Sequence, residues 1–170
     1  MPNLSLHDID LDRLRTLAGV LVRSMPTQLV IGLVGTLGAG KTTLTQSLAA
    51  AMGVDPEDVT SPTFTLLCSY DANIDAGPIR LHHLDAYRLV DEDEFLELGV
   101  EELFDADNAW VLVEWADRVE SVLPPDTLWI HIDIPASADP IAPHRQITLT
   151  TQNDALADPL ASIADAMPNQ

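Results

Sequence analysis

Apolar and polar residues follow one another along this chain in patterns that predict several strands. The segments 29–34 and 110–113 are unbroken apolar runs, which are typical of parallel strands buried on both faces of a sheet. Segments in which apolar and polar residues alternate predict further strands at 64–70, 79–85, 128–134 and 145–151. The polar segment 71–78 joins two of these strands, which predicts an antiparallel hairpin at one edge of the sheet.

Helices are predicted where apolar residues recur every three or four positions behind a capping residue. The first begins at Asp8 or Asp10 and ends near Ser24. Asp91 and Glu94 have the spacing of a capping box, which predicts the start of another helix. The remaining helical segments are expected at 43–52, 91–98, 100–104, 119–123 and 158–167, the last with Asp158 as its cap.

The segment between the strand 29–34 and the helix 43–52 carries the strongest motif. It reads Gly35-Thr36-Leu37-Gly38-Ala39-Gly40-Lys41-Thr42 and fills every fixed position of the phosphate-binding P-loop pattern Gly-x-x-x-x-Gly-Lys-[Ser/Thr]. Glycines let backbone N–H groups converge on phosphates, and the N-terminus of the following helix adds a favourable dipole. Lys41 brings a positive charge to the β- and γ-phosphates, and the Thr42 hydroxyl can coordinate Mg²⁺.

The order of elements around this motif predicts the fold class. We expect an α/β fold of the P-loop NTPase type, with three layers and a mixed, mainly parallel sheet flanked by helices. Of the 170 residues, 46% are hydrophobic and 21% are charged, which is typical of a globular protein. This length suits a single domain that includes all residues from 1 to 170.

A P-loop needs a second anchor for its metal ion, usually an acid at the carboxyl end of a neighbouring strand. Glu114 directly follows the apolar run 110–113 and is the candidate, with an ordinary surface carboxylate as the alternative. Asp85 ends another strand and shares a face with His83, so both side chains could look toward the phosphates. Asp85 could orient a water molecule, hold Mg²⁺ through one, or only cap the next turn. His82 and His83 lack the spacing to another His or Cys that a metal site needs.

The charge balance limits what the chain can bind. It has 27 acidic residues against 8 lysines and arginines, a formal net charge of −19, which excludes a broad basic face for nucleic acid. The acidity serves solubility or presents an acidic surface to a basic partner protein, and charge alone leaves both open. With one cysteine, no signal sequence and no membrane-spanning run, we expect a cytoplasmic protein without a disulfide.

The distribution of basic residues separates classes of P-loop protein. No lysine follows Lys41, so the Asn-Lys-x-Asp motif of guanine-specific proteins cannot occur, which favours ATP over GTP. A small-molecule kinase usually gathers several arginines on a lid over the transferred phosphate. This alternative is weakened, though not removed, by the scattering of single arginines at Arg80, Arg88, Arg118 and Arg145. A second alternative is a non-catalytic adaptor that senses nucleotide.

Four blocks along the chain resemble a known family. They are Gly-Thr-Leu-Gly-Ala-Gly-Lys-Thr-Thr at 35–43, Ser-Pro-Thr-Phe-Thr-Leu at 61–66, His-Leu-Asp-Ala-Tyr-Arg-Leu at 83–89 and Glu-Trp at 114–115. In this order and spacing they resemble the bacterial TsaE (YjeE) family, an ATPase family needed for threonylcarbamoyladenosine modification of tRNA. The resemblance extends over residues 28–150.

Two residues depart from the family pattern. Thr36 stands where Asp is usual, and Ala116 stands where Pro is usual after Glu-Trp. Neither position supplies a phosphate or metal ligand, so the departures bear on rate and on fit to partners more than on activity.

The resemblance implies roles for the residues at matching positions. Lys41 and Asp85 are the expected catalytic residues, and Thr42 with Glu114 is expected to hold Mg²⁺. Trp115 is expected to lie close to the site. The residues expected to bind ATP are Leu37, Gly38, Ala39, Gly40, Lys41, Thr42, Thr43 and Arg145.

The resemblance also implies a setting for this chemistry. The chain is expected to hydrolyse ATP in a complex with the threonylcarbamoyl transferase and its dimerising subunit, in the modification of position 37 of tRNA. The tRNA would be contacted only indirectly, through these partners, which agrees with the net charge of −19. The segment 61–63 is expected to be a switch-like loop that senses the γ-phosphate.

Overall fold

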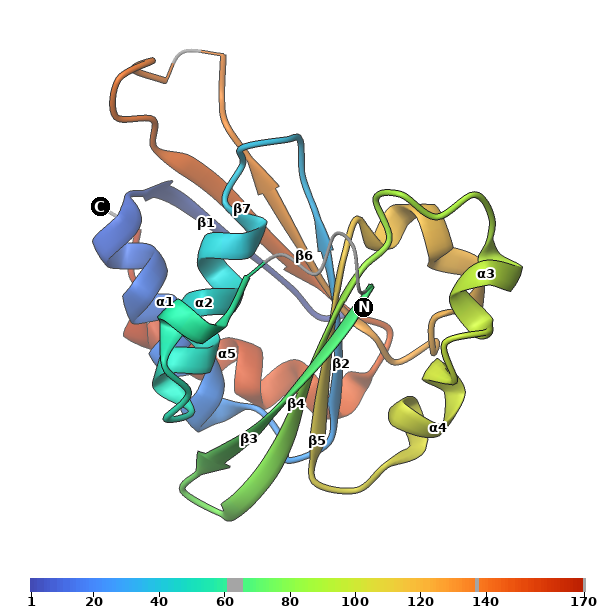
Figure 1. Cartoon of the computed structure of the whole chain (residues 1–170). Helices are drawn as coiled ribbons and strands as arrows, with labels where there is room; N and C mark the ends of the chain where they lie inside the picture. The colour runs from blue at the N-terminus through green and yellow to red at the C-terminus, as the bar shows by residue number, and fades with distance from the viewer. Residues whose placement is uncertain (61–65, 137, 170) are drawn as a thin grey trace.

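A single seven-stranded sheet forms the centre of the computed structural model, which describes residues 1–60, 66–136 and 138–169 (Figure 1). The strands lie in the order β1-β7-β6-β2-β5-β4-β3. Their bounds are β1 Asn3–Ile9, β2 Leu29–Val34, β3 Leu67–Ile74, β4 Gly77–Asp85, β5 Ala109–Glu114, β6 Leu128–Asp133 and β7 Arg145–Thr150. The central strands β6, β2, β5 and β4 pair in parallel, whereas β1, β7 and β3 pair antiparallel with their neighbours.

This arrangement confirms the predicted α/β class, the mixed sheet and the antiparallel hairpin at its edge. By pairing, however, the sheet is evenly mixed rather than mainly parallel, because both edges are antiparallel. The edge strand β1 was missed from the sequence. It pairs with β7 through an irregular register between Leu6 and Ile9, where Asp8 has a positive φ of 53°.

Helices cover both faces of the sheet. The α-helices are α1 Leu11–Ser24, α2 Lys41–Ala51, α3 Glu92–Leu96, α4 Val100–Asp105 and α5 Ala157–Ala166. Short 3-10 turns occur at η1 Pro56–Asp58, η2 Ala116–Val122 and η3 Asp154–Leu156. Figure 1 shows α1, α2 and α5 on one face, and α3 and α4 on the other. None of the helices in the described part of the chain has the length and apolar composition that a membrane crossing requires.

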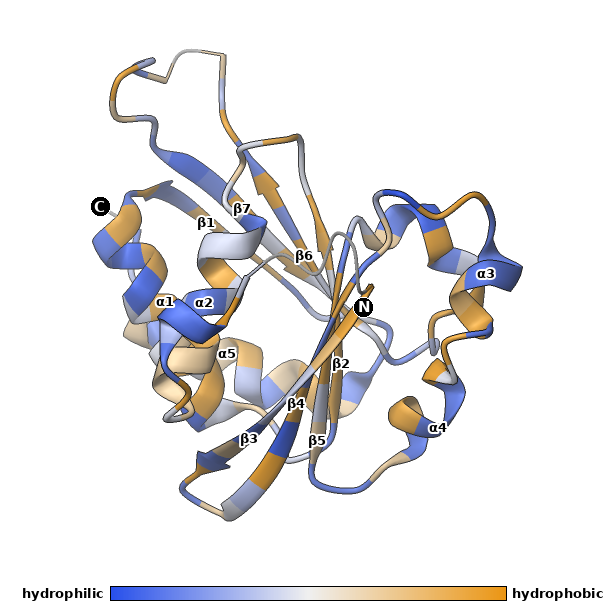
Figure 2. Ribbon diagram, viewed as in Figure 1, coloured by the Kyte–Doolittle hydropathy of each residue, from blue (hydrophilic) through white to orange (hydrophobic). Residues whose placement is uncertain are grey.

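Strands β2 and β5 are apolar along almost their whole length because both of their faces are covered. On β5, Trp110 and Leu112 belong to the core under α1, α2 and α5, whereas Val111 and Val113 belong to the core under α3 and α4. Figure 2 shows that apolar colour predominates along β2 and β5. Alternate residues therefore serve two separate cores, and the carboxyl ends of these strands are left to carry polar side chains.

Capping residues fix where the helices begin. Asp10 accepts a hydrogen bond from the Arg13 amide at the start of α1, as predicted. Asp91 accepts one from the Glu94 amide at the start of α3, so this part of the predicted capping box is confirmed. The predicted cap of the last helix is wrong, because α5 begins at Ala157 and Asp158 lies inside its first turn.

The hairpin is longer than its sequence predicts. Strand β3 continues to Ile74 and β4 begins at Gly77, so most of the polar segment 71–78 is paired strand. Its polar residues alternate with apolar ones because one face of this edge is exposed. The predicted start of the first hairpin strand at Phe64 lies outside the described residues.

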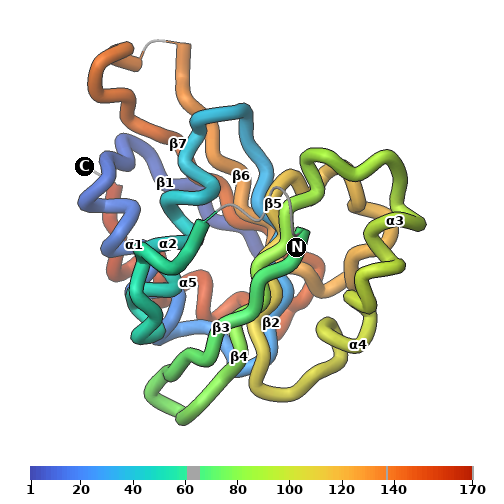
Figure 3. Tube along the Cα trace, viewed as in Figure 1, coloured from blue at the N-terminus to red at the C-terminus, as the bar shows by residue number. Residues whose placement is uncertain are grey.

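Two loops lie together at one end of the sheet. The trace in Figure 3 shows the segment 35–40, after β2, beside the loop that joins β6 to β7. Both follow the carboxyl ends of central parallel strands, where open α/β sheets place their ligands.

Truncating a buried apolar side chain is expected to lower the stability of this protein far more than truncating an exposed one. Leu112→Ala is expected to lower the free energy of unfolding by about 2–5 kcal/mol, because Leu112 is buried in a central strand. Ile141→Ala removes the same number of carbon atoms from a side chain that is 93% exposed. This variant should change the free energy of unfolding by less than about 0.5 kcal/mol. Urea denaturation measures both, and equal losses would contradict the assignment of the core.

His82 predicts a specific dependence of stability on pH. Burial lowers the pKa of this imidazole below its ordinary value, and the nearby Arg80 guanidinium lowers it further. As the pH falls, the unfolded chain therefore takes up a proton first, and the folded state loses stability until its own lowered pKa is reached. Between about pH 8 and about pH 5, urea midpoints should fall more for the native chain than for His82→Gln. Parallel pH profiles would refute this role.

Candidate functional site

The loop from β2 to α2 is shaped by its glycines. A Cβ atom on Gly35 would lie 2.6 Å from the carbonyl oxygen of Ile132, so only glycine allows the loop to pass this close to β6. Gly38 and Gly40 have positive φ values of 81° and 117°, which side chains disfavour. Gly40 is also the N-cap of α2 and offers no capping side chain, so amides of the first turn remain available to a ligand.

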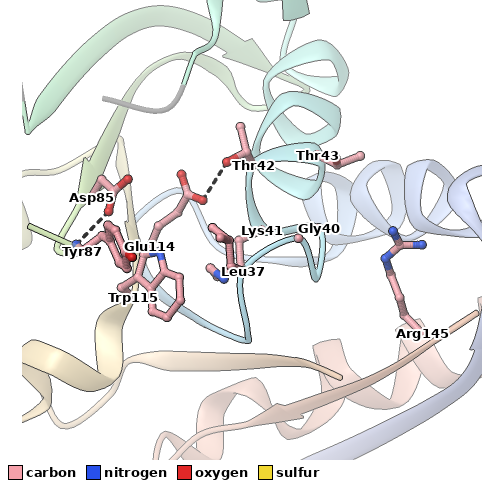
Figure 4. A pocket seen from close by; sticks show the side chains of 11 residues that line it. Leu37, Gly40, Lys41, Thr42, Thr43, Asp85, Tyr87, Glu114, Trp115 and Arg145 are labelled. Atoms are coloured by element: carbon pink, nitrogen blue, oxygen red, sulfur yellow. Dashed lines mark hydrogen bonds between the residues drawn. The ribbon is translucent and has the colours of Figure 1, made fainter. Parts of the chain in front are cut away.

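A pocket of about 370 Å³ lies above this loop (Figure 4). It is lined by Leu37, Gly38, Gly40, Lys41, Thr42, Thr43, Asp85, Tyr87, Glu114, Trp115 and Arg145. The structure therefore brings together all the residues expected from the sequence to act here except Ala39. Ala39 is buried, and its amide donates to the Thr36 carbonyl inside the loop. The predicted switch-like segment 61–63 lies outside the described residues.

Lys41 is held by the loop from which it comes. Its Nζ atom donates to the carbonyl oxygens of Gly35 at 2.6 Å and Thr36 at 2.9 Å. The same atom lies 4.0 Å from the centre of the Trp115 ring, a cation–π contact. Burial lowers the pKa of the ammonium group, while the nearby carboxylates, Glu114 foremost, oppose this shift.

Thr42 and Glu114 meet across the pocket. Glu114 ends β5, the parallel neighbour of β2, and its Oε1 atom accepts a hydrogen bond from Thr42 Oγ1 at 2.9 Å. Its other oxygen, Oε2, lies 2.5 Å from Nε2 of His83. Glu114 is only 2% exposed, so both oxygens find their partners inside the protein. The hydrogen bond brings together the two residues that are expected to hold Mg²⁺.

This pair of oxygen ligands suits Mg²⁺. Within the described ranges, no group of three or more His, Cys, Asp or Glu side chains could enclose a metal ion. Mg²⁺ fits such an open site, because it keeps several waters and takes its remaining ligands from one or two protein groups and from substrate phosphates. Thr42 and Glu114 would hold the ion from the protein side.

Asp85 lies beside Glu114. The two residues end adjacent parallel strands and are paired in register. Asp85 is 5% exposed, and its Oδ1 atom accepts a hydrogen bond from the Tyr87 amide at 2.8 Å, which fixes the carboxylate at the pocket wall. His83, on the same face of β4, was expected to look toward the phosphates with Asp85. Instead it is fully buried behind Glu114.

Arg145 approaches the loop from the opposite side (Figure 4). Its Nε atom donates to the Ala39 carbonyl at 2.6 Å. The same atom packs against Gly40, and a Cβ atom added to this glycine would lie 3.1 Å from it. The guanidinium therefore supports the loop backbone. This contact places a cation next to the loop, and the expected role of Arg145 in binding ATP stays a prediction.

Sequence reasoning missed one aromatic residue at the pocket. Tyr87 is 41% exposed, its ring lies 4.8 Å from that of Trp115, and the Arg118 guanidinium lies 5.3 Å from its centre. The signal in the sequence was its position two residues after Asp85. Trp115 itself adopts a left-handed conformation with φ of 56°, which turns its ring over Lys41.

Known proteins resemble this chain over most of its length. The family model of the threonylcarbamoyl adenosine biosynthesis protein TsaE matches residues 9–147. A curated relative from Treponema pallidum, named tRNA threonylcarbamoyladenosine biosynthesis protein TsaE, is 41% identical over 95 residues, which are 56% of this chain and 65% of the relative. A protein of the same name from Bacillus subtilis is 43% identical over 95 residues, 56% of this chain and 55% of the relative.

These matches span less than two thirds of the length of both curated relatives. A solved structure extends further. The crystal structure of YdiB from Bacillus subtilis has a TM-score of 0.72 and 27% sequence identity, and the alignment covers 96% of this chain and 95% of YdiB. Three of the four sequence blocks, at 35–43, 83–89 and 114–115, contribute residues to the pocket. Because the family model matches well over half of the chain, the chain belongs to the TsaE family.

Proposed function

We propose that this protein is a Mg²⁺-dependent ATPase that supports threonylcarbamoyladenosine modification at position 37 of tRNA. The observation that carries the proposal is the convergence of Lys41, Thr42, Glu114 and Asp85 around one pocket above the P-loop. The family to which the chain belongs, and the names of its relatives, supply the pathway.

The ligand-free contacts suggest how a triphosphate would be held. Two loop carbonyls now satisfy the Lys41 ammonium, and phosphate oxygens would replace them as stronger, charged acceptors. Amides at the start of α2 would donate to the same phosphates. When bound, Mg²⁺ would neutralise charge on the β- and γ-phosphates. Thr42 and Glu114 would then exchange their mutual hydrogen bond for contact with this ion or its waters.

Asp85 would serve the hydrolytic step. Its carboxylate lies at the pocket wall beside Glu114, where it would orient the attacking water. The water oxygen would form a bond to the γ-phosphorus while the bond from that phosphorus to the β–γ bridging oxygen breaks, giving ADP and inorganic phosphate. Lys41 and the loop amides would stabilise the charge that spreads over the transferred group.

The charge distribution supports an indirect relation to tRNA. The segment 91–107, which contains α3 and α4, has nine acidic residues and no lysine or arginine. Such a surface repels the phosphate backbone of RNA and favours a basic protein surface. In the proposed complex, the threonylcarbamoyl transferase and its dimerising subunit would bind the tRNA, and ATP hydrolysis here would reset them between turnovers.

The arginines favour hydrolysis over phosphoryl transfer to a metabolite. Of Arg80, Arg88, Arg118 and Arg145, only Arg145 lines the pocket, and it contacts the loop backbone. Arg80 pairs with Asp71 on the hairpin. Release of phosphate without any added acceptor would support the hydrolase. Single-turnover hydrolysis with and without the partner subunits would distinguish it from a nucleotide-sensing adaptor.

Reconstitution tests the proposed function directly. Modified tRNA should form over many turnovers when this protein is added to the transferase, its dimerising subunit, ATP and the donor of the threonylcarbamoyl group. Omission of the protein, or its replacement by Lys41→Ala, should restrict the reaction to about a single turnover. Equal product formation in all three mixtures would refute the proposal.

Lys41→Ala is expected to abolish ATP binding, because the variant removes the only ammonium group at the phosphates. Calorimetric titration with ATP and Mg²⁺ measures the loss. Arg15→Ala is the control, since it removes an exposed cation paired with Asp12 on α1 and should bind ATP as the native chain does. Unchanged affinity in Lys41→Ala would show that the nucleotide binds elsewhere.

Glu114→Ala and Asp85→Ala are expected to keep much of the ATP affinity and lose turnover. The first removes the acid that contacts Thr42, and the second removes the group that would orient water. Each should lower kcat by about 10²-fold or more, measured as phosphate release in the reconstituted complex. If Glu114→Ala hydrolysed ATP at the native rate, its metal role would be wrong.

A further inference from the structure

Within the part of the chain that the structure describes, the His83 ring makes one polar contact, which is with Glu114. The ring is fully buried, and Nε2 lies 2.5 Å from Glu114 Oε2. Nδ1, also buried, has no hydrogen-bond partner among residues 1–60, 66–136 and 138–169. If the side chain at this position only filled the core, leucine would fill it at a lower cost in free energy. Burying a polar ring is unfavourable unless its polar atoms form hydrogen bonds.

The strand register places His83 behind the site rather than in it. On adjacent parallel strands, His83 lies opposite Leu112, and Asp85 lies opposite Glu114. The imidazole therefore reaches diagonally, toward the carboxyl end of β5, to contact Glu114 from the core side. His83 does not line the pocket, whereas Glu114 and Asp85 do.

The contacts of Glu114 define which ring nitrogen carries a proton. The Glu114 carboxylate accepts hydrogen bonds, so Nε2 of His83 must donate. The carboxylate oxygens are then divided between two partners, with Oε2 held by His83 and Oε1 turned toward Thr42 Oγ1. Without the donor on Nε2, the carboxylate would be free to rotate about its last bond, and a buried charge would lose one of its two hydrogen bonds.

We propose that His83 is a positioning residue, which holds one oxygen of Glu114 so that the other stays directed at Thr42 and the metal ion. This inference rests on the proposed function. Hydrogen bonds to metal-ligating carboxylates orient them, and their loss typically lowers metal affinity by about 10- to 100-fold. The competing account is that His83 serves only packing.

A pair of amide variants separates these accounts. His83→Gln can place its amide N–H near the position of Nε2 and so still donate to Glu114. His83→Asn has the same amide group on a shorter side chain, which cannot reach that position. His82→Asn is the matched control, because His82 is a buried histidine next to His83 whose ring pairs with Ser69 and does not touch the site. Thermal melts verify that each variant is folded.

The readout is the effect of Mg²⁺ on ADP binding, measured calorimetrically in excess Mg²⁺ and in EDTA. The native chain, His83→Gln and His82→Asn should all bind ADP more tightly with Mg²⁺. In His83→Asn this gain should fall by about tenfold, while the affinity in EDTA stays unchanged. In a Glu114→Ala background, His83→Asn should have no further effect, because its role is exerted through Glu114.

Four results would overturn the proposal. They are a full Mg²⁺ effect in folded His83→Asn, loss of the effect in His83→Gln, equal weakening of ADP binding with and without Mg²⁺, and an additive loss in the Glu114→Ala background. If His83→Asn did not fold, His83→Leu, which fills the same core space without a donor, would replace it with the same expected loss of the Mg²⁺ effect. A native chain that showed no Mg²⁺ effect would refute the proposed function itself, and this outcome is distinct from failure of the variants alone.

Discussion

The hydrogen bond between Thr42 and Glu114 joins the two halves of the site. Its donor lies in the first turn of α2 and its acceptor at the end of β5, 72 residues apart in the chain. The bond can form only because β2 and β5 are adjacent parallel strands whose carboxyl ends reach the same edge. Two apolar strands therefore determine where a hydroxyl and a carboxylate meet, and the pocket chemistry depends on this register.

The local positive charge of the site contrasts with the acidity of the whole chain. With a formal net charge of −19, the protein repels polyanions at long range. At the P-loop, by contrast, the amides of α2, Lys41 and the adjacent Arg145 present positive groups within one pocket. A small anion that arrives with a divalent cation can enter, whereas a nucleic acid backbone has no extended surface to follow. This charge distribution agrees with the proposed function, in which the chain would bind ATP and its partners would bind tRNA.

The sequence predicted the parts of the fold that depend on local signals. The strand at 29–34, the helices capped by Asp10 and Asp91, and the family were all confirmed. The local cap predicted at Asp158 was wrong, and the other failures depend on tertiary pairing. Strand β1 has few apolar residues because it is an edge strand, and the hairpin continues through polar residues because one of its faces is exposed.

The sequence predicted the residues that line the candidate site better than the contacts that hold those residues in place. Lys41, Thr42 and Glu114 have motif positions, so their convergence could be expected. The contact of His83 with Glu114 could not, because it requires the register of β4 on β5 and a diagonal reach between strands. The spacing of His83 to other histidines and cysteines argues only against a metal site and carries no information about a contact with Glu114.

The most direct measurement is a crystal structure with Mg²⁺ and a non-hydrolysable ATP analogue. The account predicts that the cation separates Thr42 from Glu114, and that the Lys41 ammonium leaves the carbonyls of Gly35 and Thr36 for phosphate oxygens. A nucleotide bound away from the P-loop, or a cation that neither Thr42 nor Glu114 approaches directly or through water, would contradict it.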